Sequence, residues 1–150
     1  MAHEIDDLDR SILRHLRENA RMSLQEISRR TGISDATIQY RLKRMRSEGA
    51  IEAFTIRASP EATGYTVTAI MLMQTEAERH DQAMEALSRL PEVTEVYGVL
   101  GEYDLYAKVW SRSLEELNTI INESIRSIEG IEELLEIVVV ERAKEEAPPV

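Results

Sequence analysis

The feature that most constrains the fold is a pair of short helix signals within residues 23–46, joined by a single glycine turn. Ser23 opens a capping box with Glu26, and Gly32 stands where the first helix would end. Ser34 then caps a second helix, whose apolar residues recur at helical spacing and form one buried stripe: Ile38, Leu42 and Met45. Two short helices joined by a tight, glycine-containing turn are typical of the helix-turn-helix motif of DNA-binding proteins.

The residues on either side of this pair predict the rest of a small domain. A helix is expected from about Asp7 to Arg17, ending near Asn19, because its apolar residues have helical spacing and acidic residues fill its first turn. After the pair, residues 50–56 alternate between apolar and polar side chains, which predicts a strand that forms a wing. We therefore expect a winged helix-turn-helix domain over residues 1–58.

The outward face of the second helix of the pair carries the residue types that contact DNA. With the apolar stripe facing inward, a helical wheel places Tyr40 and Lys43 on the outside. Thr37, Gln39 and Arg44 flank them, so cations, an aromatic ring and short polar groups share this face. The alternative is that the cations belong only to a solvated helix face. The candidate DNA-binding residues are Ser34, Thr37, Gln39, Tyr40, Arg41, Lys43 and Arg44.

The charge of the chain is divided unequally between its halves. The net charge is −10, which on its own argues against a nucleic-acid partner. Residues 1–60, however, contain 11 Lys and Arg against 9 Asp and Glu, whereas residues 61–150 contain 7 against 19. This asymmetry predicts two modules with different partners, in which any DNA contact is made by the first half.

The second half of the chain predicts a separate domain, so that the whole is an α+β protein. Its apolar runs, capping signals and turn residues give the order βαββαβ, which is that of a ferredoxin-like fold. The expected elements are strands at 66–74, 93–100, 103–110 and 134–140, with helices at 81–90 and from the capping box at 113–116 to Gly130. We place this domain at 66–142, after a hinge at 59–65 and before a disordered tail at 143–150.

One face of this predicted sheet lacks helices to cover it. The first strand of the domain, residues 66–74, is apolar on both of its faces. Because an apolar sheet face is unfavourable in water, we expect it to pack against a second copy of the chain, giving a homodimer.

Several classes of site are absent from the sequence. There is no cysteine, which excludes disulfides, thiolate zinc sites and cysteine nucleophiles. The chain has neither a secretory signal pattern nor an apolar run near the roughly 18 residues of a membrane helix, so we expect a cytoplasmic protein. His3, His15 and His80 have no partners at a metal-binding or catalytic spacing. We expect no metal, no cofactor and no catalytic residues.

The sequence resembles the Lrp/AsnC family of transcription regulators, the leucine-responsive or feast/famine proteins, over about residues 5–141. In the first half the resemblance rests on Leu8-Asp9, Ile12-Leu13, Leu16, Asn19-Ala-Arg21, Gly32-Ile-Ser34, Thr37, Arg41-Leu42-Lys43, Glu48-Gly49 and Ile51. In the second half it rests on Gly101-Glu-Tyr103-Asp104 and on Gly130-Ile131. It implies an operator-binding regulator whose second domain is an ACT-like RAM domain. This domain dimerises, assembles into tetramers or octamers, and binds an amino-acid effector between dimers.

The effector site that the resemblance implies lies at the turn Gly101, Glu102, Tyr103 and Asp104. The backbone amides of Gly101 and Glu102 could receive a ligand carboxylate, because glycine permits a close approach. Asp104 could accept hydrogen bonds from an ammonium group. The alternative is an ordinary hairpin in which Asp104 is a solvated turn residue.

The last strand departs from the family pattern, which has hydroxyl residues shortly after the position of Gly130-Ile131. Residues 132–136 contain no Ser or Thr, and Glu136 stands where a hydroxyl is expected. If Glu136 and Asp104 share the site, two negative charges would favour lysine or arginine over an apolar amino acid. The alternatives are that Glu136 faces solvent or pairs with a neighbouring arginine, or that the protein has no effector and is regulated only by assembly.

Two other functions are compatible with this architecture. Sirohaem decarboxylases share it, which makes an enzyme the main alternative, and a stand-alone amino-acid sensor is the other. Acid–base chemistry needs a positioned histidine, tyrosine or arginine in a pocket. Neither alternative needs the cationic outward face of the helix at residues 34–46, so the sequence favours a regulator that is not an enzyme.

Overall fold

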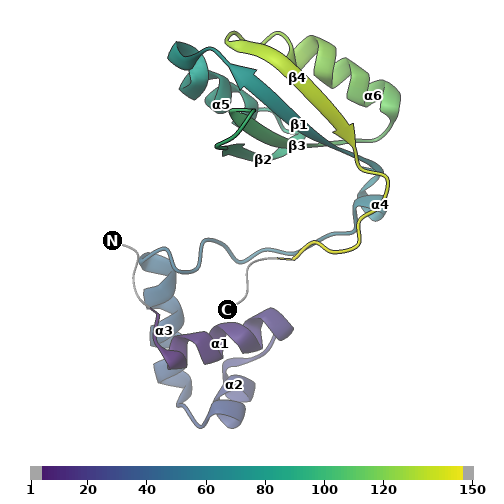
Figure 1. Cartoon of the computed structure of the whole chain (residues 1–150). Coiled ribbons are helices and arrows are strands. Elements are labelled where there is room, and N and C mark those ends of the chain that lie inside the picture. Colours follow the sequence, from purple (N-terminus) through teal and green to yellow (C-terminus); the bar gives the residue numbers. More distant parts are fainter. Residues whose placement is uncertain (1–4, 147–150) are drawn as a thin grey trace. The chain divides into compact units, whose positions relative to one another are not determined.

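The computed structural model describes residues 5–146, and the chain divides into two compact units (Figure 1). The division falls between Arg57 and Ala58, and the second unit extends to Glu145. Each unit has its own hydrophobic core.

The first unit consists of three helices, α1 (Asp7–Glu18), α2 (Leu24–Thr31) and α3 (Asp35–Ser47). Each begins at a polar cap, since the side chains of Asp6, Ser23 and Ser34 accept a backbone N–H three residues further on. Gly32 ends α2 with a left-handed backbone, φ 75°, a conformation that glycine adopts without steric cost. The predicted helix-turn-helix is therefore confirmed.

The core of this unit contains one or two apolar side chains from each helix. The fully buried members are Ile12, Ile27, Ile38 and Met45, and Ile51 is nearly so. The backbone N–H of Ile51 donates to the carbonyl of Met45 at 3.0 Å, which ties the chain after α3 to the core.

The predicted wing strand at residues 50–56 is not formed. This segment has no regular secondary structure, and Phe54 and Ile56 are 64% and 87% exposed. A strand needs a partner to satisfy its backbone groups, and the described part of the first unit contains no second strand. The Arg46 guanidinium instead donates to the carbonyls of Ile51, at 3.0 Å, and Glu52.

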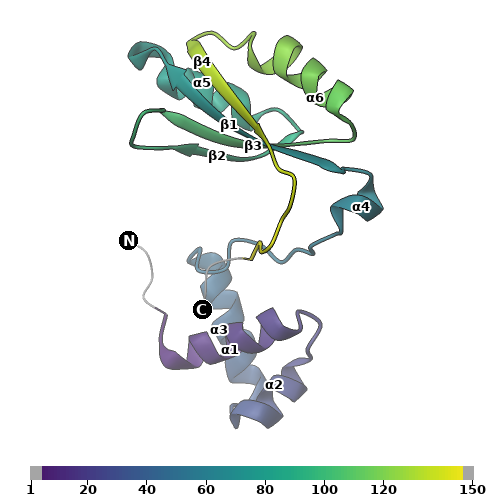
Figure 2. The same ribbon diagram turned by 45° about the vertical axis from the view of Figure 1, so that its right-hand side comes forward.

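The second unit has the predicted βαββαβ order (Figure 2). Its strands are β1 (Val67–Thr75), β2 (Val93–Gly98), β3 (Leu105–Ser111) and β4 (Ile131–Val138), and they form one antiparallel sheet in the order β2-β3-β1-β4. A 3-10 turn (η1, Ala77–Arg79) leads into α5 (His80–Ser88). The other helix, α6 (Leu114–Thr119), continues as a π-helical segment (η2, Ile120–Ile125).

Both helices pack on the same face of this sheet. Alternate residues of β1 and β3 are fully buried beneath these helices, where they contact Ala83, Leu87, Leu117 and the isoleucines of η2. The buried strand residues are Ala69, Met71, Met73, Leu105, Ala107 and Val109. The other face carries intervening side chains that include Ile70, Leu72, Tyr106 and Trp110. We call this second face the open face.

The segments next to this domain also contain ordered structure. The predicted hinge at 59–65 includes a one-turn helix, α4 (Pro60–Thr63), which Ser59 caps. Of the predicted tail at 143–150, residues 147–150 lie outside the described part, and Glu145 forms an ion pair with Lys108. Within residues 5–146, no helix has the length and apolar character needed to cross a bilayer.

Candidate DNA-binding and effector sites

Helix α3 presents one exposed polar face. Thr37, Gln39, Tyr40 and Lys43 are all exposed, and the Tyr40 side chain is 65% accessible. Because Ile38 and Met45 are fully buried, helical geometry directs these four side chains away from the core. Their row contains a cation, an amide, a phenol and a hydroxyl, which suits contacts to phosphates and base edges.

The first turn of α3 is occupied partly by its own capping interactions. The Ser34 hydroxyl accepts the backbone N–H of Thr37 at 3.2 Å, and the two hydroxyl oxygens lie 2.8 Å apart. Ser34 therefore has a structural role as the cap of this helix.

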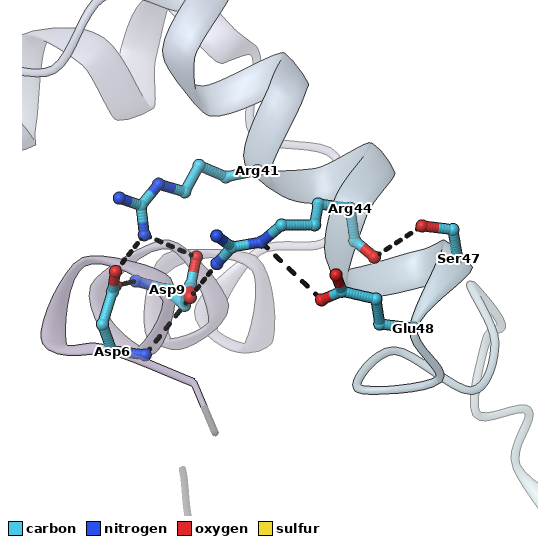
Figure 3. A network of polar contacts seen from close by, with 6 residues as sticks. All are labelled: Asp6, Asp9, Arg41, Arg44, Ser47 and Glu48. Carbon is cyan, nitrogen blue, oxygen red and sulfur yellow. Dashed lines mark hydrogen bonds and ion pairs between the residues drawn. The ribbon is translucent and has the colours of Figure 1, made fainter. Parts of the chain in front are cut away.

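Two of the candidate DNA-binding residues, Arg41 and Arg44, point to α1 instead of outward (Figure 3). The Arg41 guanidinium donates to Asp9 at 3.1 Å and also to Asp6, and that of Arg44 donates to Asp9 at 2.6 Å. Their side chains are only 20% and 24% exposed. The prediction that Arg44 flanks the outward face is corrected: the wheel gives the direction of its Cβ, but its long side chain folds back toward a buried carboxylate.

This ion-pair network has a clear electrostatic effect. The hydrogen bond from Arg41, with that from the Asp9 backbone, lowers the pKa of Asp6 from 3.8 to about 2. The hydrogen bonds from the Arg41 guanidinium to the side chains of Asp6 and Asp9 raise the pKa of Arg41. The Arg44 Nε is buried and makes no hydrogen bond, although Glu48 lies 3.8 Å away as an ion-pair partner. The charged side chains of this network pair with one another. Lys43 is not part of the network and is an exposed cation of α3.

Asp9 is the site residue that the sequence reasoning missed. Its sequence context indicates an acidic residue in a first helical turn and a position shared with the family, yet it is fully buried. A signal was present, since Asp9 precedes Ile12 by three residues and therefore lies on the apolar side of α1. An acidic residue within an apolar stripe requires a cationic partner elsewhere in the fold.

The candidate effector turn is attached firmly to the end of β1. The Asp104 carboxylate accepts the backbone N–H of Thr75 at 2.8 Å, and the Asp104 N–H donates to the Met73 carbonyl at 2.9 Å. The Gln74 side chain donates to the carbonyl of Glu102, also at 2.9 Å. Asp104 is thus partly buried and anchors the turn with one of its carboxylate oxygens, so it is not simply a solvated residue.

The outer part of the turn is open. Gly101 and Glu102 are exposed, and a Cβ placed on Gly101 would have no neighbour within 4 Å. Tyr103 is half-buried beside them.

Glu136 does not share this site within one chain. It pairs with Met71, so it lies on the helix side of the sheet at the exposed edge strand β4. Asp104 instead bonds to Thr75, four residues further along β1, which is about 13 Å at the rise of a strand. The two carboxylates are therefore apart within one chain, and their predicted closeness stays a prediction for a site formed between subunits.

Comparisons with known proteins agree with the two units. The family model for winged helix-turn-helix DNA-binding matches residues 5–52, and that for the Lrp/AsnC ligand binding domain matches residues 68–149. The HTH-type transcriptional regulator FL11 of Pyrococcus furiosus is 36% identical over 141 residues, covering 94% of this chain and 93% of its own length.

Solved structures give the same result. The structure of E. coli AsnC superposes with a TM-score of 0.92 at 31% identity, covering 99% of this chain and all of that one. A transcriptional regulator of Neisseria meningitidis in complex with L-Met superposes with a TM-score of 0.87 at 21% identity, covering 95% of this chain and 94% of that one. This second likeness concerns the fold.

Proposed function

The chain belongs to the Lrp/AsnC family of DNA-binding transcription regulators, and from this premise we propose that α3 recognises operator DNA while the second domain binds an amino acid. The relatives are named as regulators, so a sirohaem decarboxylase is not favoured. The observation that carries the proposal is the exposed row of Thr37, Gln39, Tyr40 and Lys43 on the second helix of the helix-turn-helix.

The side chains of this row suit different kinds of contact with DNA. Lys43 is a flexible point charge that suits a phosphate, whereas the Gln39 amide can both donate to and accept from a base edge. Tyr40 adds a ring and a hydroxyl at the centre of the exposed face. Arg41 and Arg44 are left out of the contacting set because their guanidinium groups are paired with Asp6 and Asp9.

Salt dependence of DNA binding tests the phosphate contact. The parent and Lys43→Met are titrated onto one DNA duplex at several salt concentrations, with binding followed by fluorescence anisotropy. Loss of one phosphate contact reduces the magnitude of the slope of log K against log salt by about one. The matched control is Arg89→Met, which removes a cation at the C-cap of α5 in the other unit and is expected to leave the slope unchanged. An unchanged slope for Lys43→Met would contradict the proposed DNA face.

For the effector we propose a small amino acid at the turn formed by Gly101, Glu102, Tyr103 and Asp104. Support comes from the match to a ligand-binding domain, from the open space at Gly101, and from the L-Met complex of the Neisseria meningitidis regulator. The amides of Gly101 and Glu102 would bind the carboxylate. The second oxygen of Asp104, or a group from another subunit, would bind the ammonium.

A thermal-shift screen with the twenty amino acids tests this proposal. A ligand at about 100 times its Kd adds roughly 2.7 kcal/mol to the stability of the folded state. Calorimetric titration with the best ligand follows, on the parent and on Asp104→Asn and Glu136→Gln. We expect the first substitution to weaken binding and the second to leave it unchanged, because Glu136 is remote from the turn in the same chain. No stabilisation by any amino acid would contradict the proposal.

We further propose that the open face of the sheet mediates a homodimer, from which tetramers or octamers are built. Its exposed apolar side chains include Tyr97, Leu135 and Ile137, which are between 42% and 55% accessible. Burial of such a patch favours association. A dimer would present two copies of α3 to a pseudo-palindromic operator.

A further inference from the structure

The most unusual group in the first unit is the buried carboxylate of Asp9, which lies between α1 and α3. Its side chain has no accessible surface, and each of its oxygens accepts a hydrogen bond from a different arginine of α3 (Figure 3). One oxygen also accepts the backbone N–H of Asp6 at 3.2 Å, which completes the capping box of α1. A buried charge is tolerated only with such partners, so Asp9 and the arginines depend on one another.

This pairing restricts what Arg41 and Arg44 can do. A guanidinium that leaves Asp9 for a DNA phosphate would leave a buried carboxylate with fewer partners, which is costly. Lys43 has no such restriction, because it is exposed and no ion pair involves it within residues 5–146. Adjacent cations of the same helix therefore have different roles.

The pairing also fixes the orientation of α3. Arg41 and Arg44 are three residues apart, so they leave the same side of the helix about one turn from each other. Two contacts to a single buried group restrict both the rotation of α3 about its axis and its sliding along α1. The directions of Gln39 and Tyr40 from the helix axis depend on that rotation, since each residue advances the helix by about 100°.

We propose that Asp9 is a positioning residue for DNA recognition: by holding Arg41 and Arg44 it sets the rotation of α3, and the two arginines neutralise Asp9 instead of phosphates. This inference rests on the proposed role of α3. Its consequence is that an acidic residue contributes to DNA specificity without touching DNA. Charge alone gives the opposite expectation, because removing a carboxylate from a DNA-binding domain weakens repulsion and strengthens binding to every sequence.

The first test compares Asp9→Asn with Asp7→Asn in the full chain. Asp7 is exposed and stands in the same turn of α1, so both variants lose one negative charge at nearly the same place. The affinities are measured for a duplex that the parent selects from a random pool and for an unrelated duplex. We expect the ratio of the two affinities to fall about tenfold in Asp9→Asn, equivalent to one lost base contact, and to stay constant in Asp7→Asn. An unchanged ratio in Asp9→Asn would overturn the proposal.

The second test remains informative if Asp9→Asn does not fold. The salt slope of DNA binding is compared for Arg44→Met and Lys43→Met, which remove neighbouring charges and leave the same side chain. We expect Arg44→Met to weaken binding to the selected duplex without changing the slope of log K against log salt. We expect Lys43→Met to reduce the magnitude of that slope by about one. If both reduce the slope, α3 remains the DNA-contacting helix but Arg44 contacts phosphate, and the positioning role of Asp9 is wrong. If neither does, the proposed DNA face itself fails.

Discussion

At the scale of single residues, Arg41 controls the protonation of Asp6. The folded-state pKa of Asp6 lies near 2, below its ordinary value of 3.8, so its charged form stabilises the fold. This contribution is fully present above about pH 4 and is lost as the pH falls toward 2. In a chain in which Arg41 cannot donate to Asp6, the part of this contribution that comes from Arg41 is lost, while the hydrogen bond from the Asp9 backbone remains.

We therefore predict that Arg41→Met raises the pKa of Asp6 toward 3.8, as measured by NMR titration of the side-chain carboxyl. Arg44→Met is the control, since Arg44 bonds to Asp9 and not to Asp6. In the control the Asp6 pKa should stay near 2. A low pKa that persists in Arg41→Met would show that the cap geometry alone lowers it.

Single residues also show where sequence reasoning stops. The exposure of Tyr40 and Lys43 follows from helical periodicity, because the position of Cβ on a helix is fixed by the backbone. The direction of the Arg44 guanidinium does not follow from helical periodicity, because a long side chain can reach a partner that lies 35 residues away in the sequence. The pairing of Asp9 was not predicted because its arginine partners lie 32 and 35 residues away, although its place on the apolar side of α1 indicates burial.

At the scale of elements, the turn between α2 and α3 depends on Gly32. Its φ of 75° lies in the left-handed region, and a Cβ there would meet nothing within 4 Å. The cost of a side chain at this position is therefore conformational and not a clash.

We predict that Gly32→Ala lowers the free energy of unfolding of the first unit by about 1–2 kcal/mol, measured by chemical denaturation with circular dichroism. Gly101→Ala serves as the control in the second unit, because a Cβ at Gly101 would have as much space but the backbone there has no positive φ. The free energy of unfolding of the second unit should hardly change in this variant. Equal effects of the two substitutions would contradict the argument from φ.

The elements were predicted well where a local signal defines them. Caps at Ser23, Ser34 and Ser113, together with hydrophobic periodicity, indicated helices that the structure contains. The wing strand at 50–56 was predicted from alternation alone, and alternation cannot supply a pairing partner. The register that separates Glu136 from Asp104 is likewise set by long-range pairing and is not encoded locally.

At the scale of the whole molecule, the open face of the sheet is the surface through which we propose that the protein assembles. Leu135 and Ile137 pair with Leu72 and Ile70, so all four side chains lie on this face, away from the helices. Glu136, between the first two, lies on the opposite face.

We predict that the full chain is a dimer or a larger assembly at micromolar concentration by light scattering. The substitution Ile137→Asp is expected to dissociate it, because a charge would be buried in the interface. Glu136→Gln, on the other face of the same strand, should leave the assembly unchanged. A parent protein that is monomeric at this concentration would contradict the dimer.

Recognition of DNA sequence by the outward face of α3 is tested by selecting duplexes from a random pool with the parent and with Gln39→Ala, followed by sequencing. We predict that the parent enriches two half-sites about one helical turn apart, or a multiple of that distance. We predict that Gln39→Ala loses its preference at one position in each half-site, a change of roughly 1–3 kcal/mol per base contact. Enrichment of the same sequence with the same preference by both proteins would contradict it.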